Sequence, residues 1–283
     1  MHSSNLKSSS SSPNSQVVGL NSIIKKSQTR VRKTLEGKPE FVMSLVETQN
    51  VLGKFDKNKA TFVVLHVDLV GSTKLAMMLP MDRLTKIIQA FNQEMSLAVK
   101  AFGGHILKYV GDAVLAFFVV VTEHKSEAKV ACINAINCAN YMLRIAHEAI
   151  NPILRQYGCP EMNLRIGVDI GENAIIQSGW DIHPNIRNRH KNRKNTSITN
   201  HNKKRRDPLM KKAVYDVLSY TLSIAVKMTA FARPNHLVIG DPVYTRLDHK
   251  QRSAFQRVHI SPDIWDYVCK NSEVNIYDLY TNV

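Results

Sequence analysis

The stretch "FVVLHVDLVGST", residues 62–73, decides the fold, because a nearly continuous apolar run in it ends on a single carboxylate, Asp68. A short apolar run rich in β-branched residues and followed by a glycine is typical of a buried strand. The sequence therefore predicts a strand over residues 61–67 with Asp68 at its end. Either a turn or a bound ligand can account for a charge at that position.

A second carboxylate, Asp112, lies in a tight turn further along the chain. Apolar runs at residues 105–109 and 113–120 flank the Val110-Gly111-Asp112 turn, which predicts a β-hairpin. If this hairpin lies beside the first strand, both aspartates project from one edge of the sheet, where they can bind divalent metal ions with hard oxygen ligands. Two aspartates placed for their turn propensity are the alternative, and the residue pattern alone leaves both interpretations open.

Helical and strand patterns alternate over the rest of the core. Apolar residues at helical spacing predict long helices over residues 81–102 and 126–156. The further expected elements are strands at 162–169 and 174–177 hinged on Gly171, a helix at 214–231, a strand at 237–239, a helix at 241–247 and closing strands at 255–260 and 274–280. Because hairpins occur among them, the expected fold class is α+β, with a mixed sheet rather than an all-parallel one.

Charge divides the chain into a neutral core and basic appendages. The formal net charge is +15, and residues 1–40 hold seven Lys or Arg against two Glu. The stretch 187–212 holds eleven Lys or Arg against one Asp. We therefore predict a disordered, basic, Ser-rich tail over 1–40, a lead-in segment over 41–57 that includes a short helix near 41–52, and one folded domain over 58–283.

A basic segment at about 180–212 interrupts this domain and shows no apolar periodicity, so we expect a loop insertion there. A solvated, disordered loop is the simplest interpretation. Segments of this charge density also bind nucleic acid, anionic membrane or an acidic protein, with an affinity that falls as salt rises. The segment lacks interleaved aromatic residues, which argues against stacking on bases. Its histidines, His183, His190 and His201, lack regular ligand spacing, so no metal site is expected among them.

Cysteine usage and hydropathy indicate the compartment. The four cysteines, Cys132, Cys138, Cys159 and Cys269, show neither CxxC spacing nor a disulfide framework, and we expect all four to be structural in a reducing environment. The N-terminus lacks the apolar core of a secretory signal. The longest apolar run, residues 113–121, is far shorter than the roughly 20 residues needed to cross a bilayer. A soluble, cytoplasmic protein is therefore expected.

Four segments together carry a family resemblance: "VDLVGST", "GGHILKYVGDAVLAFF", "LRIGVDIGE" and "YDVLSYTLSIAVKMTAFA". In this order and spacing they resemble the catalytic domain of the class III nucleotidyl cyclases, the adenylate and guanylate cyclase family. The resemblance covers about residues 58–282 apart from the insertion. It implies a ferredoxin-like sheet covered by helices and a head-to-tail homodimer with active sites at the subunit interface.

The resemblance also implies a metal site and a reaction. The two metal-binding aspartates of the family correspond to Asp68 and Asp112, and the backbone carbonyl of Leu69 would also face a metal. Two divalent metal ions, Mg²⁺ or Mn²⁺, would assist attack of the ribose 3'-hydroxyl on the α-phosphate, with pyrophosphate as the leaving group.

Base recognition in the family rests on a lysine and an aspartate, which correspond to Lys108 and to Asp216 at the head of a later helix. A lysine that donates to ring nitrogen N1 and a carboxylate that accepts from the 6-amino group read adenine, because guanine presents the opposite pattern. ATP is therefore the expected substrate, and 3',5'-cyclic AMP is the expected product.

The helix after Asp216 departs from the family pattern. The family has an asparagine that orients the ribose and an arginine that stabilises the pentavalent phosphorus, whereas this chain has Ser223 and Lys227 there, one helical turn apart. Lysine keeps the positive charge but lacks the planar fork of arginine. Loss of one well-placed transition-state donor costs on the order of 10²- to 10³-fold in rate. A further phosphate-binding lysine of the family has its nearest counterpart in Lys270, one position out of register, and an ordinary loop lysine is the alternative there.

Three functions remain open at this point. The first is an adenylate cyclase that works as a homodimer, in which the two aspartates of one subunit face the base-reading and helix residues of the other. The second is an ATP-binding regulatory module, weakened or inactive because of Ser223 and Lys227. The third is a nucleic-acid-binding protein that uses a cyclase-like scaffold to present the basic loop.

Overall fold

The computed structural model describes residues 13–40, 45–55, 58–121, 125–184, 209–268 and 277–283. In this part of the chain one mixed sheet forms in the order β2-β3-β1-β4-β6-β8-β7, with β5 paired to β4. β4 and β6 are parallel, and the other pairs are antiparallel. The strands are β1 (Lys59–Leu69), β2 (His105–Val110), β3 (Ala113–Val119), β4 (Leu164–Pro184), β5 (Leu209–Leu218), β6 (His236–Gly240), β7 (Phe255–Arg257) and β8 (Leu279–Asn282).

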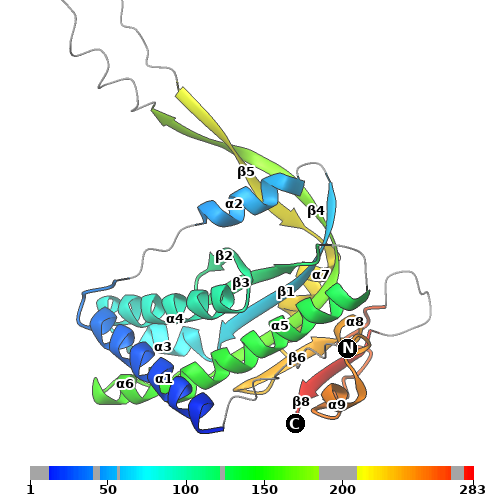
Figure 1. Cartoon of the computed structure of the whole chain (residues 1–283). Helices are drawn as coiled ribbons and strands as arrows, with labels where there is room; N and C mark the ends of the chain where they lie inside the picture. The colour runs from blue at the N-terminus through cyan, green and yellow to red at the C-terminus, as the bar shows by residue number, and fades with distance from the viewer. Residues whose placement is uncertain (1–12, 41–44, 56–57, 122–124, 185–208, 269–276) are drawn as a thin grey trace, which may run out of the picture.

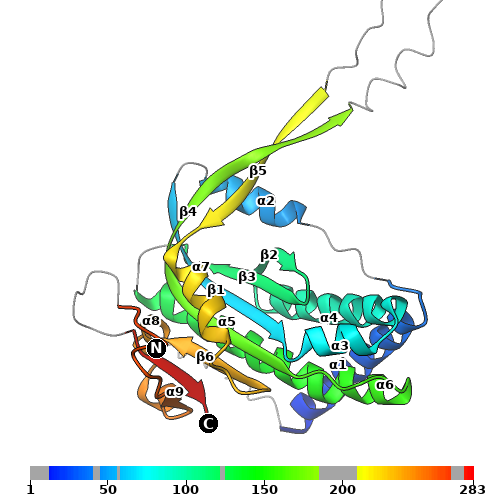
Figure 2. The ribbon, with the colours of Figure 1, turned by 180° about the vertical axis from the view of Figure 1, so that it is seen from behind.

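Helices cover both faces of the sheet. Figure 1 shows α4 and α5 in front of it, and Figure 2, from behind, shows α7 on the opposite face. This arrangement confirms the predicted fold class, a mixed α+β sheet covered by helices. The helices are α1 (Pro13–Leu35), α2 (Val46–Leu52), α3 (Ser72–Met78), α4 (Met81–Ala101), α5 (Lys125–Ile145), α6 (Asn151–Gln156), α7 (Tyr220–Thr229), α8 (Asp241–Tyr244) and α9 (His249–Arg252). A short 3-10 helix follows α2 at Gly53–Phe55, and a π-helical turn at Ala146–Ile150 joins α5 to α6.

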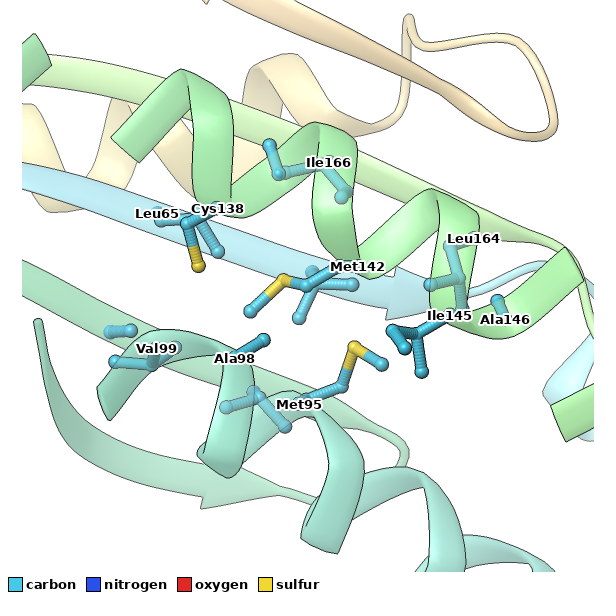
Figure 3. Close-up of a cluster of buried hydrophobic side chains, with 14 of the residues drawn as sticks. Leu65, Met95, Ala98, Val99, Cys138, Met142, Ile145, Ala146, Leu164 and Ile166 are labelled. Atoms are coloured by element: carbon cyan, nitrogen blue, oxygen red, sulfur yellow. The ribbon is translucent and has the colours of Figure 1, made fainter. Parts of the chain in front are cut away.

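The main core lies between the sheet and the pair α4 and α5. Figure 3 shows Met95 and Ala98 of α4 facing Met142 and Ile145 of α5, beneath β1 and β4. The strands alternate apolar residues to this face because successive side chains point to opposite sides. Three of the cysteines, Cys132, Cys138 and Cys159, are buried and free, as predicted. Burial raises the pKa of Cys132 and Cys138 to about 12, so neither is a thiolate at neutral pH; Cys269 lies outside the described residues.

A second, smaller cluster fills the face that α7 covers, and we call it the α7-side cluster. It comprises Leu52, Ala60, Phe62, Val64, Leu107, Leu115, Phe117, Ile175, Val217 and Ala225. The helix approaches the sheet closely at Gly167 on β4, where a Cβ atom would lie 2.4 Å from the carbonyl oxygen of Ala225. A glycine is therefore required there, and α7 is held directly against the strand beside β1.

The N-terminal segment differs from the predicted disordered tail, because residues Pro13–Leu35 form α1. This helix packs against α4, α6 and the π-helical turn. Its buried residues recur at helical spacing, which places them on one stripe. They are Ile24, Ser27, Val31, Thr34 and Leu35. The prediction of disorder is corrected over this helix, since contacts with distant helices supply what its composition lacks.

A buried ion pair fixes α1 on α4. Arg30 donates to both carboxylate oxygens of Glu94, at 2.8 and 2.6 Å, and Ser27 donates to the same carboxylate at 2.6 Å. The Glu94 side chain is 2% exposed. A carboxylate at that depth requires charged and hydrogen-bonded partners, and α1 provides both.

The region around the basic segment differs from the prediction in two ways. The two strands expected at 162–169 and 174–177 are one continuous strand, β4, which runs through to Pro184. It pairs with β5 to form a two-stranded ribbon that extends beyond the body of the sheet (Figure 1). The expected loop at 180–212 is therefore strand at both ends, and residues 185–208 lie outside the described residues.

The helix expected at 214–231 begins only at Tyr220. Residues up to Leu218 belong to β5, so Asp216 lies on a strand rather than at the head of a helix. Ser219 is the N-cap of α7, and its side chain accepts from the N–H of Leu222 at 2.9 Å. Aromatic and β-branched residues before the serine favour strand, and the cap sets the helix start.

Candidate active site

The two predicted metal-binding carboxylates lie together. Asp68 is the residue before the last in β1, and Asp112 is in the turn between β2 and β3. The two lie close because β1 pairs with β3. Burial and the nearby charge of Asp112 raise the pKa of Asp68, and the two carboxyl groups are within hydrogen-bonding reach of each other. The N–H of Leu69 and the positive charge of Arg165 act in the opposite direction. The prediction that Asp68 and Asp112 share one edge of the sheet is confirmed.

Two adjacent, half-buried carboxylates fit a divalent cation. Their repulsion disfavours the doubly ionised pair in the absence of a counter-charge, and hard oxygen donors suit Mg²⁺ or Mn²⁺. Within the described residues no three His, Cys, Asp or Glu side chains gather into a ready-made metal centre. The site therefore offers two carboxylates, and the carbonyl of Leu69 as a further ligand stays a prediction.

A cavity of about 530 Å³ lies beside Asp112, between α3 and α4. Its volume is in the range of small-molecule sites. It is lined by Ser72, Thr73, Ala76, Leu84, Thr85, Ile88, Gln89, Gly111 and Asp112. A bound nucleotide at the aspartates would therefore have room next to the turn that carries Asp112.

His66 is a site neighbour that the sequence analysis missed. It lies two residues before Asp68, so both side chains point to the α7 face. Its Nδ1 lies 3.0 Å from the hydroxyl of Thr229, which itself donates to the carbonyl of Ala225 at 2.7 Å. Nδ1 is therefore the donor. Burial lowers the pKa of His66 to about 4, so a neutral imidazole ties β1 to α7. The sequence signal that could have identified His66 is its position as a lone polar residue inside an apolar strand.

The predicted base-reading residues form an ion pair. Lys108 Nζ donates to Asp216 Oδ2 at 2.8 Å. The other carboxylate oxygen of Asp216 accepts from the N–H of Val217 at 2.8 Å, which fixes the orientation of the group. The two side chains are 39% and 36% exposed. A donor and an acceptor therefore lie side by side, and both are accessible from solvent.

A β-bulge aims Lys108 at the α7 face. Ile106 pairs with Ala116 and Lys108 with Leu115, so two residues of β2 oppose one of β3. Strict alternation would place Lys108 on the opposite face from Leu107. The extra residue brings both to the side of Leu115, in the α7-side cluster.

The two residues that replace the family's asparagine and arginine lie on the exposed side of α7. Ser223 donates to the carbonyl of Ser219 one turn earlier, at 3.3 Å. Lys227 Nζ lies 5.5 Å from the centre of the Tyr267 ring, and interaction with this tyrosine raises the pKa of Lys227. Both side chains are exposed, and neither contacts the aspartate pair among the described residues. Lys270 lies outside the described residues.

The structure thus gathers the predicted residues into three groups. The aspartate pair lies at the end of β1, the Lys108–Asp216 pair joins β2 to β5, and Ser223 with Lys227 faces outward from α7. In the predicted homodimer this third group, like the Lys108–Asp216 pair, would serve the site of the other subunit, and this arrangement stays a prediction. No helix in the described part of the chain is long and apolar enough to cross a membrane.

Two curated relatives match part of the chain, and no protein-family model matches it. The cytidylate cyclases of Escherichia coli and Staphylococcus aureus are 30% and 33% identical over 126 and 112 residues. The matched segments make up 41% and 40% of this chain and 26% of each relative. The chain therefore spans about a quarter of the length of the curated relatives that it matches.

Solved structures with the same fold are cyclases. The guanylyl cyclase Cya2 is 15% identical with a TM-score of 0.55, over 80% of this chain and 93% of its own. The adenylyl cyclase CyaB from P. aeruginosa is 17% identical with a TM-score of 0.52, over 80% and 95%. The guanylate cyclase domain of RhGC from Catenaria anguillulae, in complex with GTP, is 13% identical with a TM-score of 0.51, over 80% and 98%. The chain therefore has the fold of an adenylyl or guanylyl cyclase catalytic domain.

Proposed function

We propose that this chain is a nucleotidyl cyclase whose substrate base presents an amino group beside an unprotonated ring nitrogen. The Lys108–Asp216 pair carries the proposal, because it holds one donor and one acceptor side by side, 2.8 Å apart. Adenine has the complementary edge, and so has cytosine, whereas guanine and uracil present the reverse order of donor and acceptor. The pair therefore favours ATP and CTP over GTP and UTP.

CTP is the first candidate substrate within this class, because both matched relatives bear the name cytidylate cyclase. ATP, which the family resemblance implies, is the second. The donor and acceptor at Lys108 and Asp216 serve the two bases equally well, so ring size, and not edge chemistry, must separate them.

In the proposed reaction the ribose 3'-hydroxyl attacks the α-phosphorus, the 3'-oxygen to phosphorus bond forms, and the bond to the pyrophosphate oxygen breaks. Asp68 and Asp112 would hold divalent cations, which supply positive charge at the phosphates when bound. Lys108 donates to the ring nitrogen and Asp216 accepts from the amino group, which orients the base. In a homodimer, Lys108 and Asp216 would come from the subunit opposite Asp68 and Asp112. The same subunit would supply Lys227, which would offset charge on the phosphorus, and Ser223, which would donate to the ribose.

A catalytically weak nucleotide-binding module is the second candidate function, and the state of α7 favours it. The Ser223 hydroxyl is engaged with its own helix, and Lys227 lies against Tyr267. Both groups would have to leave these partners to reach a substrate. Nucleotide and metal binding would survive in such a module, while turnover would be slow.

Product analysis of the purified full chain tests these proposals. The chain is incubated with Mn²⁺ and each of the four nucleoside triphosphates, and products are separated by liquid chromatography and identified by mass. We expect a 3',5'-cyclic nucleotide and pyrophosphate from CTP or ATP, lost in Asp68→Asn and kept in Asp82→Asn, an exposed carboxylate on α4.

Three other results would change the conclusion. Product from GTP or UTP alone overturns the assignment of the base. Binding of CTP or ATP without product, together with product from the Ser223→Asn/Lys227→Arg double variant, supports the weak module. If neither protein turns over or binds a nucleotide, both nucleotide functions are wrong. A salt-dependent shift with DNA or RNA then becomes the measurement of interest, because it tests whether the basic segment at about 180–212 binds nucleic acid.

A further inference from the structure

The base-reading residues come from strands that are not neighbours. β3, β1 and β4 separate β2 from β5 in the sheet. At roughly 4.8 Å per strand, a flat sheet would hold β2 and β5 about 19 Å apart. The side chains of Lys108 and Asp216 nevertheless meet at 2.8 Å. Because an exposed ion pair contributes little net stability, the pair cannot by itself hold the two strands in this arrangement.

Helix α2 contacts both strands through hydrogen bonds. Thr48 donates through Oγ1 to the carbonyl of Ile106 on β2, at 2.7 Å. Gln49 makes two bonds to the backbone of Tyr215 on β5: its Nε2 donates to the carbonyl at 3.0 Å, and its Oε1 accepts from the N–H at 2.7 Å. Consecutive residues of one helix thus bind two strands that do not touch in the sheet.

These bonds fall next to the base-reading residues. The carbonyl that Thr48 binds belongs to Ile106, the residue at which the β2 register shifts and Lys108 is turned to the α7 face. The peptide that Gln49 binds belongs to the residue immediately before Asp216. Each bond therefore fixes the backbone within two residues of one member of the pair.

The position of α2 itself is fixed by burial. Leu52 at its end is fully buried in the α7-side cluster, and Thr48 is 3% exposed. Gly53 follows, and a Cβ atom there would lie 3.1 Å from the Tyr215 ring. The helix can therefore approach β5 closely, and it cannot shift without exposing apolar surface. In Figure 1, α2 lies between the β2 hairpin and the ribbon of β4 and β5.

We propose that α2 is a clamp that sets the spacing of the base-reading pair, with Thr48 and Gln49 as positioning residues for base selection. The inference rests on the proposed cyclase function and adds to it the element that makes the selection accurate. Selection between an amino and a keto base requires the donor and the acceptor to be held at the spacing of adjacent base atoms. If α2 no longer holds the two strands, Lys108 and Asp216 remain present, but their side chains can move to bind either an amino base or a keto base.

The test compares matched variants at both positions. Thr48→Val removes the hydroxyl at nearly constant volume, and Thr48→Ser restores it. Gln49→Leu removes both bonds to Tyr215. Glu47→Gln, an exposed change on the same helix, is the control. For each protein, kcat/KM is measured for the preferred substrate, CTP or ATP, and for the keto nucleotide of the same ring size, UTP or GTP.

We expect Thr48→Val and Gln49→Leu to reduce the ratio of the two kcat/KM values by about three- to tenfold each, the range of one lost hydrogen bond. The change should come from a higher KM for the amino nucleotide and a lower KM for the keto nucleotide, with kcat nearly constant. Thr48→Ser and Glu47→Gln should keep the wild-type ratio. An equal loss of activity towards both nucleotides would show only structural damage and would overturn the proposal.

A second measurement separates the clamp from the proposed function. Hydrogen exchange at the Tyr215 amide requires no substrate, and we expect it to accelerate in Gln49→Leu and to stay slow in Glu47→Gln. If the wild-type chain makes no cyclic nucleotide but this exchange pattern is seen, the cyclase proposal fails while the clamp stands. If the chain turns over and neither exchange nor base ratio changes, the clamp is wrong and the cyclase stands.

Discussion

The two charged pairs of the site are built in opposite ways. Lys108 and Asp216 carry opposite charges and satisfy each other at 2.8 Å without a ligand. Asp68 and Asp112 carry like charges, and burial together with the charge of Asp112 raises the pKa of Asp68. In the proposed function the first pair would be organised before the substrate arrives, as selection of a base requires. A cation bound at the second pair would relieve its repulsion, so the proposed metal binding would be linked to the stability of that edge of the sheet.

The largest expected effect tests the like-charged pair. Asp112→Asn should reduce turnover by on the order of 10³-fold, because one of two carboxylate ligands is lost. The same change should leave the melting temperature in EDTA equal or higher, since it removes the repulsion with Asp68. Thermal melts with and without Mn²⁺ measure the second effect. If Asp112→Asn keeps the full stabilisation by Mn²⁺, while Asp82→Asn behaves as wild type, the pair is not the metal site.

The next effect concerns α7, the region that departs from the family. Ser223→Asn combined with Lys227→Arg should raise kcat by up to about 10²-fold, because a longer donor and a planar fork reach the ribose and phosphate. The single variants should give smaller gains. Rates under saturating nucleotide measure the change. A double variant with unchanged kcat and unchanged product would mean that this face of α7 does not serve the reaction.

Exchanging the two charges of the base-reading pair is expected to change specificity more than rate. Lys108→Glu with Asp216→Lys keeps an ion pair but reverses donor and acceptor, so it should shift preference from CTP or ATP towards UTP or GTP by about ten- to hundredfold. Competition between an amino and a keto nucleotide in one reaction gives the ratio directly. Unchanged preference in the swapped protein would show that the base is read elsewhere.

The smallest effect extends the comparison to a carboxylate whose pKa is set mainly by burial, with weaker opposing effects from the charges of Asp241 and Arg246. Asp169 on β4 is fully buried and accepts a hydrogen bond from Tyr277, and burial raises its pKa to about 7. The unfolded chain releases that proton near pH 4. Between about pH 4 and 7 the native state therefore holds the proton that the unfolded state has lost, so stability falls as pH rises through this window.

Urea unfolding of wild type and Asp169→Asn across this range checks the sign. The free energy of unfolding of the wild type should fall relative to the variant, by at most about 1.4 kcal/mol per pH unit, and level off above pH 7. A difference that is constant with pH would show that Asp169 is ionised in the native state throughout.

The parts of the fold that follow local patterns were predictable. The strand before Asp68 and the hairpin around Asp112 have apolar runs of the right length and turn residues between them, and β1, β2 and β3 agree with them. The pairing of Lys108 with Asp216 followed from the family resemblance, and a 108-residue separation left no local signal for it. α1 was missed because its burial depends on Glu94, which lies 64 residues beyond Arg30.

Other differences between prediction and structure also arise from contacts between residues that are far apart in the sequence. Gly171 in an apolar stretch indicates a break, but it lies beneath Thr221 of α7, where a Cβ atom would lie 2.1 Å from the threonine hydroxyl. The glycine therefore serves close packing, and β4 continues through it. The role of α2 depends on backbone groups of β2 and β5, and backbone hydrogen bonds to a side chain leave no pattern in the residues of the strands.

Because of the bulge in β2, the face on which Lys108 lies depends on the number of residues in that strand as well as on their identity. Lys108 faces α7 because one extra residue opposes Leu115. Loss of the single codon for Tyr109 would let Leu107 pair with Leu115 and Lys108 with Val114, which would restore alternation and turn Lys108 towards α4, although every residue of the proposed site would still be encoded. Comparison of related genes by residue identity alone would count such a protein as complete, so the number of residues between His105 and Asp112 is itself a marker of base reading.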